Sequence, residues 1–222
     1  IPKALGTAVN VYVLKKRVVR QAAIAITYDC PCRCRFCSAH NIKNAPAPVM
    51  ATHEIEALID QFAALGCLSI CFSGGEPLTH PDIARLVRHT RSRNMFCSII
   101  TSCVNYSDAR WAELKKAGVN TFYFSVDGIG EKHDAFRGVN GLFSRVERGV
   151  AACRDLHIDF AFNGVVTNEN IADGSIYEII EYCQQRHIDY FVLATSATGK
   201  YTDPDHLLTQ ENLVEFDRIR TM

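Results

Sequence analysis

Short apolar runs alternate with amphipathic segments along most of the chain. The apolar runs are rich in β-branched and aromatic residues and are too short for core helices, so each is predicted to be a strand. They occupy residues 22–28, 67–73, 95–102, 120–127, 158–167 and 188–195. In the other segments apolar residues recur at every third or fourth position, which is the period of an amphipathic helix. These helical segments cover residues 52–66, 81–93, 107–118, 142–156, 174–186 and 209–220.

The order of these elements predicts an α/β fold with one parallel sheet. Six strand–helix units in series are typical of such sheets, and nearly continuous apolar strands are expected where helices cover the sheet. The sheet is then either open and doubly wound or curved like a barrel. Chemically unusual segments follow at least four successive strands, which favours the barrel. Since a complete barrel has eight units, we predict a partial (β/α)6 TIM-like barrel with parallel strands.

Composition and charge exclude some classes of protein without choosing among the rest. Lys and Arg together number 24, as do Asp and Glu, so no net charge attracts nucleic acid or anionic lipid. The basic run over residues 14–20 has no interleaved aromatic residues and is expected to be a solvated edge. No apolar run approaches the about 18 residues that a membrane-spanning helix needs. We therefore expect no membrane segment and find no strong nucleic-acid signal.

The ten cysteines are distributed in a way that argues against a disulfide framework. Cys30, Cys32, Cys34 and Cys37 lie within eight residues, directly after the first predicted strand. The other six are scattered, mostly among apolar residues, where buried free thiols are common. The pattern predicts a reducing compartment, the cytoplasm, and one metal-binding loop.

Three of the loop cysteines, Cys30, Cys34 and Cys37, have the spacing C-x3-C-x2-C. A zinc or structural thiol loop is the alternative, but structural zinc normally takes four ligands in two close pairs, and no second C-x2-C pair occurs. Three thiolates suit a [4Fe-4S] cluster and leave one of its irons without a protein ligand. That iron can bind a substrate or cofactor directly. Cys32 lies outside the three-ligand pattern and is treated as a loop residue whose role stays open.

Several short motifs follow successive strands in an order known from one family. The three cysteines, with Phe36 directly before the last, resemble the signature of radical S-adenosylmethionine (SAM) enzymes. The segments SGGEP (73–77), SVDG (125–128) and HDAFRG (133–138) extend the resemblance over almost the whole chain. In particular, the chain resembles the SPASM- and twitch-type members, which mature peptides or cofactors.

This resemblance implies a definite chemistry. Cys30, Cys34 and Cys37 would hold a [4Fe-4S] cluster, and the amino and carboxylate groups of SAM would chelate its fourth iron. One electron, supplied by an external donor such as flavodoxin or ferredoxin, splits SAM into methionine and a 5′-deoxyadenosyl radical. The radical then removes a hydrogen atom from the substrate. The cofactors carry the hard chemistry, while the protein orients them and excludes water.

The resemblance also implies which residues surround the cofactors. They are Phe36, Gly74, Gly75, Glu76, Ser102, Ser125, Asp127, Arg137 and Asn163. Phe36 is expected to pack near the adenine. Gly74 and Gly75 would let the backbone approach the methionine moiety, because no Cβ intervenes. Glu76 would accept a hydrogen bond from the amino group of SAM.

The polar residues at the later strand ends are expected near the ribose and the carboxylate of SAM. Ser102, Ser125 and Asp127 would bind ribose hydroxyls, although a serine also caps helices and Asp-Gly also marks turns. Arg137 would pair with the SAM carboxylate through its guanidinium fork, or else form a surface ion pair with Asp134 or Glu131. Asn163 would face the cofactor or satisfy the backbone at a bulge.

The motifs do not fix the substrate. Peptide or cofactor maturation is the expected role; a radical SAM enzyme for a nucleotide or sugar is one alternative, and an iron–sulfur electron-transfer or binding module without SAM chemistry is another. Residues 1–222 are expected to form the radical SAM core domain, with a strand or extension over about residues 1–20. A C-terminal auxiliary-cluster domain is expected only outside this chain.

Overall fold

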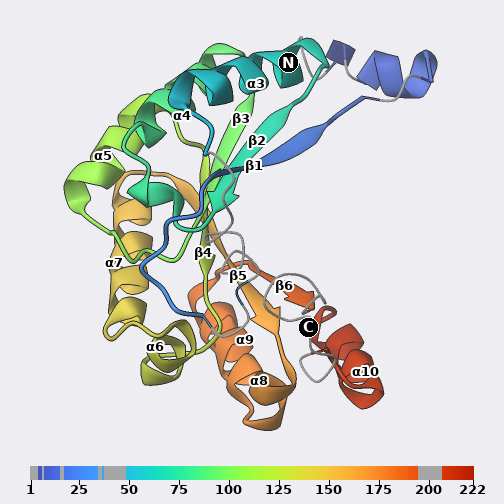
Figure 1. Cartoon of the computed structure of the whole chain (residues 1–222). Helices are drawn as coiled ribbons and strands as arrows, with labels where there is room; N and C mark the ends of the chain where they lie inside the picture. The colour runs from blue at the N-terminus through green and yellow to red at the C-terminus, as the bar shows by residue number, and fades with distance from the viewer. Residues whose placement is uncertain (1–4, 7, 16–17, 35–36, 38–48, 195–206) are drawn as a thin grey trace.

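The computed structural model describes residues 5–6, 8–15, 18–34, 37, 49–194 and 207–222. Within them, six strands form one parallel sheet in which strands consecutive in the chain are neighbours. The strands are β1 (Gln21–Thr27), β2 (Ser69–Gly74), β3 (Phe96–Thr101), β4 (Thr121–Ser125), β5 (Asp159–Val166) and β6 (Tyr190–Ala194). Figure 1 shows the sheet curving from β1 to β6 as a crescent. The predicted partial barrel of parallel strands is confirmed.

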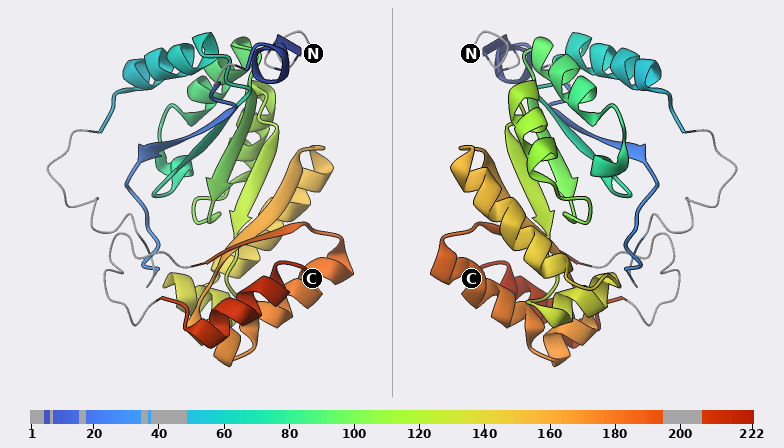
Figure 2. Two further views of the ribbon diagram at one scale, coloured as in Figure 1. Left: turned by 90° about the vertical axis from the view of Figure 1, so that its right-hand side faces the viewer. Right: turned by 90° about the vertical axis from the view of Figure 1, so that its left-hand side faces the viewer.

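Helices connect the strands and lie along the convex side of the crescent, except that the last one follows β6 and packs beside the two helices that precede it (Figures 1 and 2). They are α3 (Thr52–Ala64), α4 (Ile83–Ser92), α5 (Asp108–Ala117), α6 (Glu131–Arg137), α7 (Leu142–Asp155), α8 (Asn168–Ala172), α9 (Ser175–Arg186) and α10 (Gln210–Ile219). Every predicted strand and helix begins and ends within two residues of its observed bounds. The short helices α6 and α8 were not predicted. Among the described helices, none has both the length and the apolar character that crossing a membrane requires.

The described part of the N-terminal segment contains no strand. A strand or extension was expected over about residues 1–20, but the described part contains one turn of π-helix, Val9–Val13. Tyr12 and Val13 are 68% and 69% exposed, so none of the described strands covers this segment. An unpaired strand would leave its backbone groups without partners. A local bond from the backbone N–H of Leu14 to the carbonyl of Val9, at 2.9 Å, satisfies part of the backbone instead.

The hydrophobic core lies between the sheet and the helices on its convex side. Side chains that point to the helices alternate along each strand with side chains that point to the concave face. The largest fully buried side chains on the sheet are Phe72, Phe122, Phe124 and Phe162. Trp111 of α5 stacks on Phe122 with ring centroids 4.9 Å apart. Because this face is filled, ligands must approach from the concave face or from the ends of the strands.

The concave face is only partly covered. Paired residues of neighbouring parallel strands point to the same face, and Ser125, Asn163 and Phe191 are paired in this way across β4, β5 and β6. Asn163 is half-buried and Phe191 is 53% exposed. Tyr123 of β4 meets Phe191 edge to face at 5.9 Å. An aromatic pair therefore lies beside the row of polar side chains that leads to the carboxyl end of the sheet.

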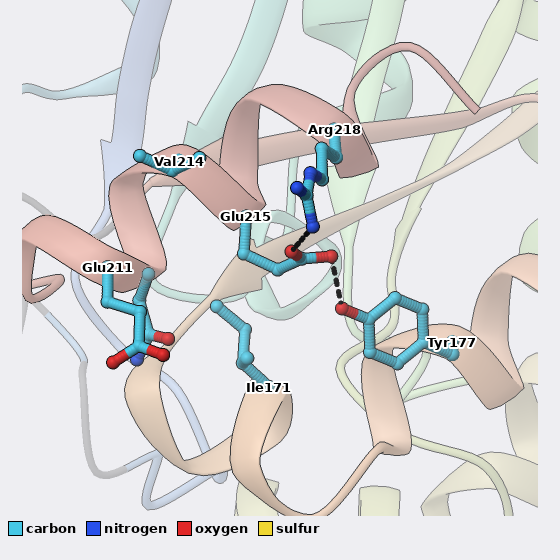
Figure 3. A pocket seen from close by; sticks show the side chains of 7 residues that line it. Ile171, Tyr177, Glu211, Val214, Glu215 and Arg218 are labelled. Atoms are coloured by element: carbon cyan, nitrogen blue, oxygen red, sulfur yellow. Dashed lines mark hydrogen bonds and ion pairs between the residues drawn. The ribbon is translucent and has the colours of Figure 1, made fainter.

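A separate cavity lies where α10 packs on α8 and α9. It has a volume of about 510 Å³, and Figure 3 shows the side chains that line it. The hydroxyl of Tyr177 donates to Glu215 at 2.6 Å, and Glu215 also forms an ion pair with Arg218 at 3.2 Å. The residues that line this cavity belong to helices. It is distinct from the strand ends that carry the chemically unusual motifs.

Candidate active site

The predicted cluster ligands lie in the loop that follows β1. Cys34 is buried, while Cys30 and Cys37 are half-buried, and all three are free thiols. The backbone N–H of Cys37 donates to the carbonyl of Cys34 at 3.4 Å, which keeps the last two cysteines close together. Phe36, expected near the adenine, lies outside the described residues. The loop places thiols at the carboxyl end of the sheet, at which α/β barrels build their active sites.

Cys32 lies between Cys30 and Cys34 and contacts both ends of the loop. A hydrogen bond with Cys32 lowers the pKa of the Cys30 thiol. The same bond raises the pKa of Cys32 to about 11. A further bond with Cys32, together with burial, raises the pKa of Cys34, and the positive charge of Arg137 opposes that rise. Cys32 therefore lies within hydrogen-bonding reach of two of the predicted cluster ligands.

The glycine motif packs against the start of the cysteine loop. A Cβ on Gly74, whose φ is +123°, would lie 2.2 Å from the carbonyl oxygen of Thr27, and one on Gly75 would lie 2.5 Å from that of Asp29. The backbone N–H groups of Gly75 and Glu76 donate to these same carbonyls at 2.7 and 2.8 Å. The two glycines thus allow the backbone at the end of β2 to pair with the chain that enters the loop. Their approach to the methionine of SAM stays a prediction.

Glu76 connects the ends of β2 and β3. Its side chain is 1% exposed and accepts hydrogen bonds from the hydroxyl of Thr101 at 2.7 Å and from the backbone N–H of Leu78 at 3.1 Å. The backbone N–H and hydroxyl of Ser102 donate to its other oxygen at 2.8 and 2.5 Å. Both oxygens are therefore engaged by the protein. A SAM amino group at Glu76 would have to share an oxygen with these donors.

Ser102 also contacts the cysteine loop. The Cys32 thiol lies 3.5 Å from the Ser102 hydroxyl, at hydrogen-bond distance for sulfur. Ser102 does not cap the next helix, because Ser107 fills that role by accepting a hydrogen bond from the backbone N–H of Arg110. Ser102 therefore does not act as a helix cap but connects Glu76 with the cysteine loop. Its predicted bond to a ribose hydroxyl is not tested.

Asp127 and Arg137 form a buried ion pair at the end of β4. The Nε of Arg137 donates to Oδ2 of Asp127 at 2.6 Å, and Nη2 pairs with the same oxygen. The other oxygen of Asp127 accepts from the backbone N–H of Val165 on β5 at 2.8 Å. The alternative of a surface ion pair with Asp134 or Glu131 does not describe this arrangement, because Arg137 is only 9% exposed and pairs with Asp127.

Arg137 also reaches the cysteine loop. Its Nη1 lies 3.7 Å from Sγ of Cys34, within hydrogen-bond range for sulfur. The backbone N–H of Arg33 donates to the carbonyl of Arg137 at 2.8 Å. The carboxyl end of α6 is therefore tied to the loop by a backbone bond and by a side-chain bond. The end of β4 and the loop after β1, which are about a hundred residues apart in sequence, meet at this point.

Ser125 and Asn163 lie next to each other on the concave face. The Ser125 hydroxyl donates to Oδ1 of Asn163 at 3.4 Å. Asn163 pairs in regular register with β4 and with β6, so the bulge alternative is wrong. Asn163 is only half-buried, and its amide can donate to a ligand on the concave face. Contact of these two residues with the cofactor stays a prediction.

His133 lies beside the Asp127–Arg137 pair and was not among the predicted site residues. It is fully buried on α6, and its Nδ1 accepts from the backbone N–H of Asp127 at 3.3 Å. Its Nε2 is buried without a hydrogen-bond partner among the described residues. Burial, reinforced by Arg137, lowers the pKa of His133 to about 3. The available signal was its spacing from Arg137, because residues four apart share one face of a helix.

The loop supplies the type of ligand that an iron–sulfur cluster needs. Three thiols come from one short loop, and the sulfur of Cys34 has a cationic hydrogen-bond donor beside it. In the described part of the chain, no group of three His, Cys, Asp or Glu side chains is spaced to hold one metal ion. Thiolates are the usual ligands of [4Fe-4S] clusters. A parallel half-barrel with such a loop at its carboxyl edge defines a class of iron–sulfur α/β enzyme.

Comparison with known proteins identifies the family. The family model "Radical SAM superfamily" matches residues 24–183, and the chain belongs to this family. The AdoMet-dependent heme synthase of Nitratidesulfovibrio vulgaris is 30% identical over 161 residues, which are 72% of this chain and 43% of that protein. The GTP 3′,8-cyclase of Marinobacter nauticus is 29% identical over 212 residues, or 91% of this chain and 62% of that protein.

A third sequence relative and a solved structure are also similar to this chain. The PqqA peptide cyclase of Gluconobacter oxydans is 33% identical over 150 residues, covering 66% of this chain and 41% of that protein. The crystal structure of Streptococcus suis SuiB bound to S-adenosylmethionine has a TM-score of 0.76 over 92% of this chain and 46% of that one, with 20% identity, and shares its fold. The chain thus spans about two fifths to three fifths of the length of these curated relatives.

Proposed function

We propose that this chain is the core of an enzyme that cleaves SAM reductively and uses the resulting radical to remove a hydrogen atom from its substrate. The observation that carries this proposal is the Radical SAM family match over residues 24–183, which spans both the cysteine loop after β1 and the Gly-Gly-Glu-Pro turn after β2. These segments meet through the bonds of Gly75 and Glu76 to the backbone that enters the loop. An electron carrier has no use for such an amino-acid-binding turn.

In this proposal each group of residues has one task. Cys30, Cys34 and Cys37 hold the cluster, which together with SAM supplies the one-electron cleavage to methionine and a 5′-deoxyadenosyl radical. Ser125 and Asn163 bind the nucleoside from the concave face, and the Gly-Gly-Glu-Pro turn lies near the methionine. The protein orients SAM and keeps water away from the radical. An external donor of the flavodoxin or ferredoxin kind supplies the electron.

The decisive assay measures 5′-deoxyadenosine. The protein is reconstituted anaerobically with iron and sulfide, reduced, and incubated with SAM. We expect 5′-deoxyadenosine from the unaltered protein and from Cys183→Ala, a buried cysteine on α9 outside the loop. We expect none from Cys34→Ala. An iron–sulfur carrier or a zinc protein would form no 5′-deoxyadenosine in any variant, and that result would refute the proposal.

Peptide or cofactor maturation is the substrate class we favour. The sequence relatives at 30% and 33% identity are a heme synthase and a peptide cyclase. The aromatic pair Tyr123 and Phe191 on the concave face offers an apolar surface to a tetrapyrrole ring or to an apolar peptide side chain. The test supplies deuterated candidate substrates and measures deuterium in 5′-deoxyadenosine. Transfer from a tetrapyrrole or a precursor peptide supports this class.

A nucleotide substrate is the second candidate. It is favoured by the GTP 3′,8-cyclase relative, whose alignment covers 91% of this chain. The same deuterium experiment separates the two candidates, because deuterated GTP would label 5′-deoxyadenosine only if the nucleotide is the substrate. Labelling from GTP and not from peptides or tetrapyrroles would replace the favoured class.

We further propose that residues 1–222 act as the core domain of a protein that works in the cytoplasm. Six scattered free cysteines in the described chain, all buried, are consistent with a reducing compartment. The balanced charge gives no support to nucleic acid as a partner. Fractionation of cells that express the natural gene tests the compartment, and recovery with the membrane or periplasmic fraction would contradict it.

A further inference from the structure

The guanidinium of Arg137 contacts both a carboxylate and a cysteine sulfur. Nε and Nη2 face the carboxylate of Asp127, and Nη1 faces the sulfur of Cys34 at 3.7 Å. The residue is 9% exposed, so water does not screen these contacts strongly. An arginine guanidinium stays protonated in proteins, and the carboxylate of Asp127 beside it favours the charged form. The side chain is therefore a fixed, charged donor beside one of the three predicted cluster ligands.

The surroundings hold this donor in place. Asp127 is itself fixed on two sides, since its carboxylate accepts from Val165 of β5 and its backbone N–H donates to His133 of α6. A Cβ at Gly128 would lie 2.8 Å from the backbone nitrogen of His133, so only glycine allows α6 to lie this close to the end of β4. The backbone bond from Arg33 to Arg137 fixes the loop side. The Asp127–Arg137 pair is therefore buried and held in position by hydrogen bonds from β5, α6 and the cysteine loop.

We propose that the Asp127–Arg137 pair sets the reduction potential of the cluster through the sulfur of Cys34. Asp127 acts as a positioning residue that aims the guanidinium, and Arg137 donates the hydrogen bond to the ligand sulfur. Hydrogen bonds to ligand sulfurs are among the factors that tune cluster potentials, and outer partners of metal ligands commonly tune the metal. Reduction adds negative charge to the cluster and its sulfurs, so a cationic donor favours the reduced state.

Reduction of the cluster requires one electron. One electron passes from an external one-electron donor of the ferredoxin or flavodoxin class to the cluster. The donor is oxidised, the cluster is reduced by one electron, and no covalent bond of Arg137 or Cys34 forms or breaks. Loss of the hydrogen bond is expected to lower the equilibrium constant for reduction about tenfold, which for one electron is about 59 mV.

This inference rests on the proposed function in one respect, namely that the loop holds a cluster. It differs from the expected role of Arg137 as partner of the SAM carboxylate, because it requires no SAM. A potential measured without SAM therefore reports on the Asp127–Arg137 pair beside Cys34 and not on SAM binding. The dissociation constant for SAM, measured on the same samples, reports on the carboxylate role.

The experiment compares three proteins, each the full chain reconstituted anaerobically with iron and sulfide. The first is unaltered, and the second carries Asp127→Asn with Arg137→Gln, which removes both charges together and leaves no unpaired buried ion. The third carries Arg85→Gln, a control arginine that is 53% exposed and pairs with Glu56 on the outer helices. Redox titration followed by electron paramagnetic resonance gives the midpoint potential, and iron and sulfide are assayed in each sample.

We expect the midpoint potential of the double variant to lie about 59 mV below that of the unaltered protein, which corresponds to the tenfold change in the equilibrium constant for reduction. The midpoint potential of Arg85→Gln is expected to be unchanged. An unchanged potential in the double variant would overturn the proposal, and a loss of SAM affinity in the same sample would then assign Arg137 to the carboxylate. A double variant that fails to retain iron and sulfide would also overturn it, because the pair would then serve loop assembly. An unaltered protein that holds the cluster but forms no 5′-deoxyadenosine refutes the proposed function without affecting this inference.

Discussion

At the scale of single residues, the site depends on buried polar groups whose partners come from different strands. Glu76 illustrates this, since each of its oxygens accepts two hydrogen bonds and three of the four donors belong to Thr101 and Ser102. Buried carboxylates are stable only when their hydrogen bonds are satisfied. The carboxylate therefore fixes the spacing between the ends of β2 and β3, on which the cysteine loop rests.

Replacement of Glu76 by glutamine is expected to destabilise the protein. The amide group of glutamine turns one acceptor into a donor that faces the donors already present, so a buried polar group is left unsatisfied. Such a group costs about 1–3 kcal/mol. Chemical denaturation of Glu76→Gln against the unaltered protein measures this loss. The matched control is Glu113→Gln on the exposed side of α5, for which no measurable change is expected; equal stability of all three proteins would contradict the account.

His133 predicts a dependence of stability on pH. Its pKa is lowered to about 3 in the folded protein, from 6.5 for a free histidine. Between these two pH values the unfolded chain binds a proton that the folded chain does not, so stability is lost as the pH falls from about 6.5 towards 3. The slope due to this one group approaches about 1.4 kcal/mol per pH unit.

The measurement compares denaturation free energies of the unaltered protein and His133→Leu at several pH values. Near pH 7 the variant is less stable, because the N–H of Asp127 loses its acceptor. Its stability should fall less steeply below pH 6.5, so the two curves converge as the pH falls. Parallel curves for the two proteins would show that His133 takes up its proton equally in the folded and the unfolded protein. They would thereby contradict its placement in the core.

At the scale of the elements, the pattern of apolar residues was sufficient to predict the strands and long helices. Each strand of the sheet buries one face against the helices, and the sequence records this as a run of apolar residues at the predicted position. The seven residues of α6 span two turns, too few for a helical period to stand out. The N-terminal Val9–Val13 is helical and not a strand, because strand propensity is realised only where a neighbouring strand pairs with it.

Gly75, directly after β2, gives a second prediction about the stability of the protein. Replacement of Gly75 by alanine would place a Cβ 2.5 Å from the carbonyl oxygen of Asp29, and the neighbour is backbone, which cannot move aside cheaply. Overpacking of this kind typically costs about 1–3 kcal/mol. Because Asp29 leads directly into the cysteine loop, Gly75→Ala should also retain less iron and sulfide after reconstitution.

The control for this variant is Gly174→Asn before α9. Gly174 has φ of +75°, and a Cβ at this position would have no neighbouring atom within 4 Å. Asparagine tolerates this left-handed conformation better than most residues. The stability and metal content of the control are expected to stay close to those of the unaltered protein. Full retention of iron by Gly75→Ala would contradict the proposed support of the loop by the turn.

At the scale of the whole molecule, the crescent brings distant segments to one edge. The cysteine loop follows β1, yet it contacts Ser102 after β3 and Arg137 after β4. The sequence predicted that these segments share an edge, because the carboxyl ends of parallel strands lie together. It did not predict which side chains meet there, since the pairing of Asp127 with Arg137 depends on how α6 lies against the strands. For the same reason Cys32 could not be placed next to Ser102.

The central claim is that Cys30, Cys34 and Cys37 hold a cluster with one iron open to SAM. The most direct measurement is electron–nuclear double resonance on the reduced, reconstituted protein with SAM labelled with ¹⁷O in its carboxylate. The account predicts hyperfine coupling between the cluster and the label, in the unaltered protein and in Cys32→Ala alike. A cluster that shows no coupling to bound SAM, or that gains coupling only when Cys32 is replaced, would mean that a fourth thiolate closes it and would contradict the claim.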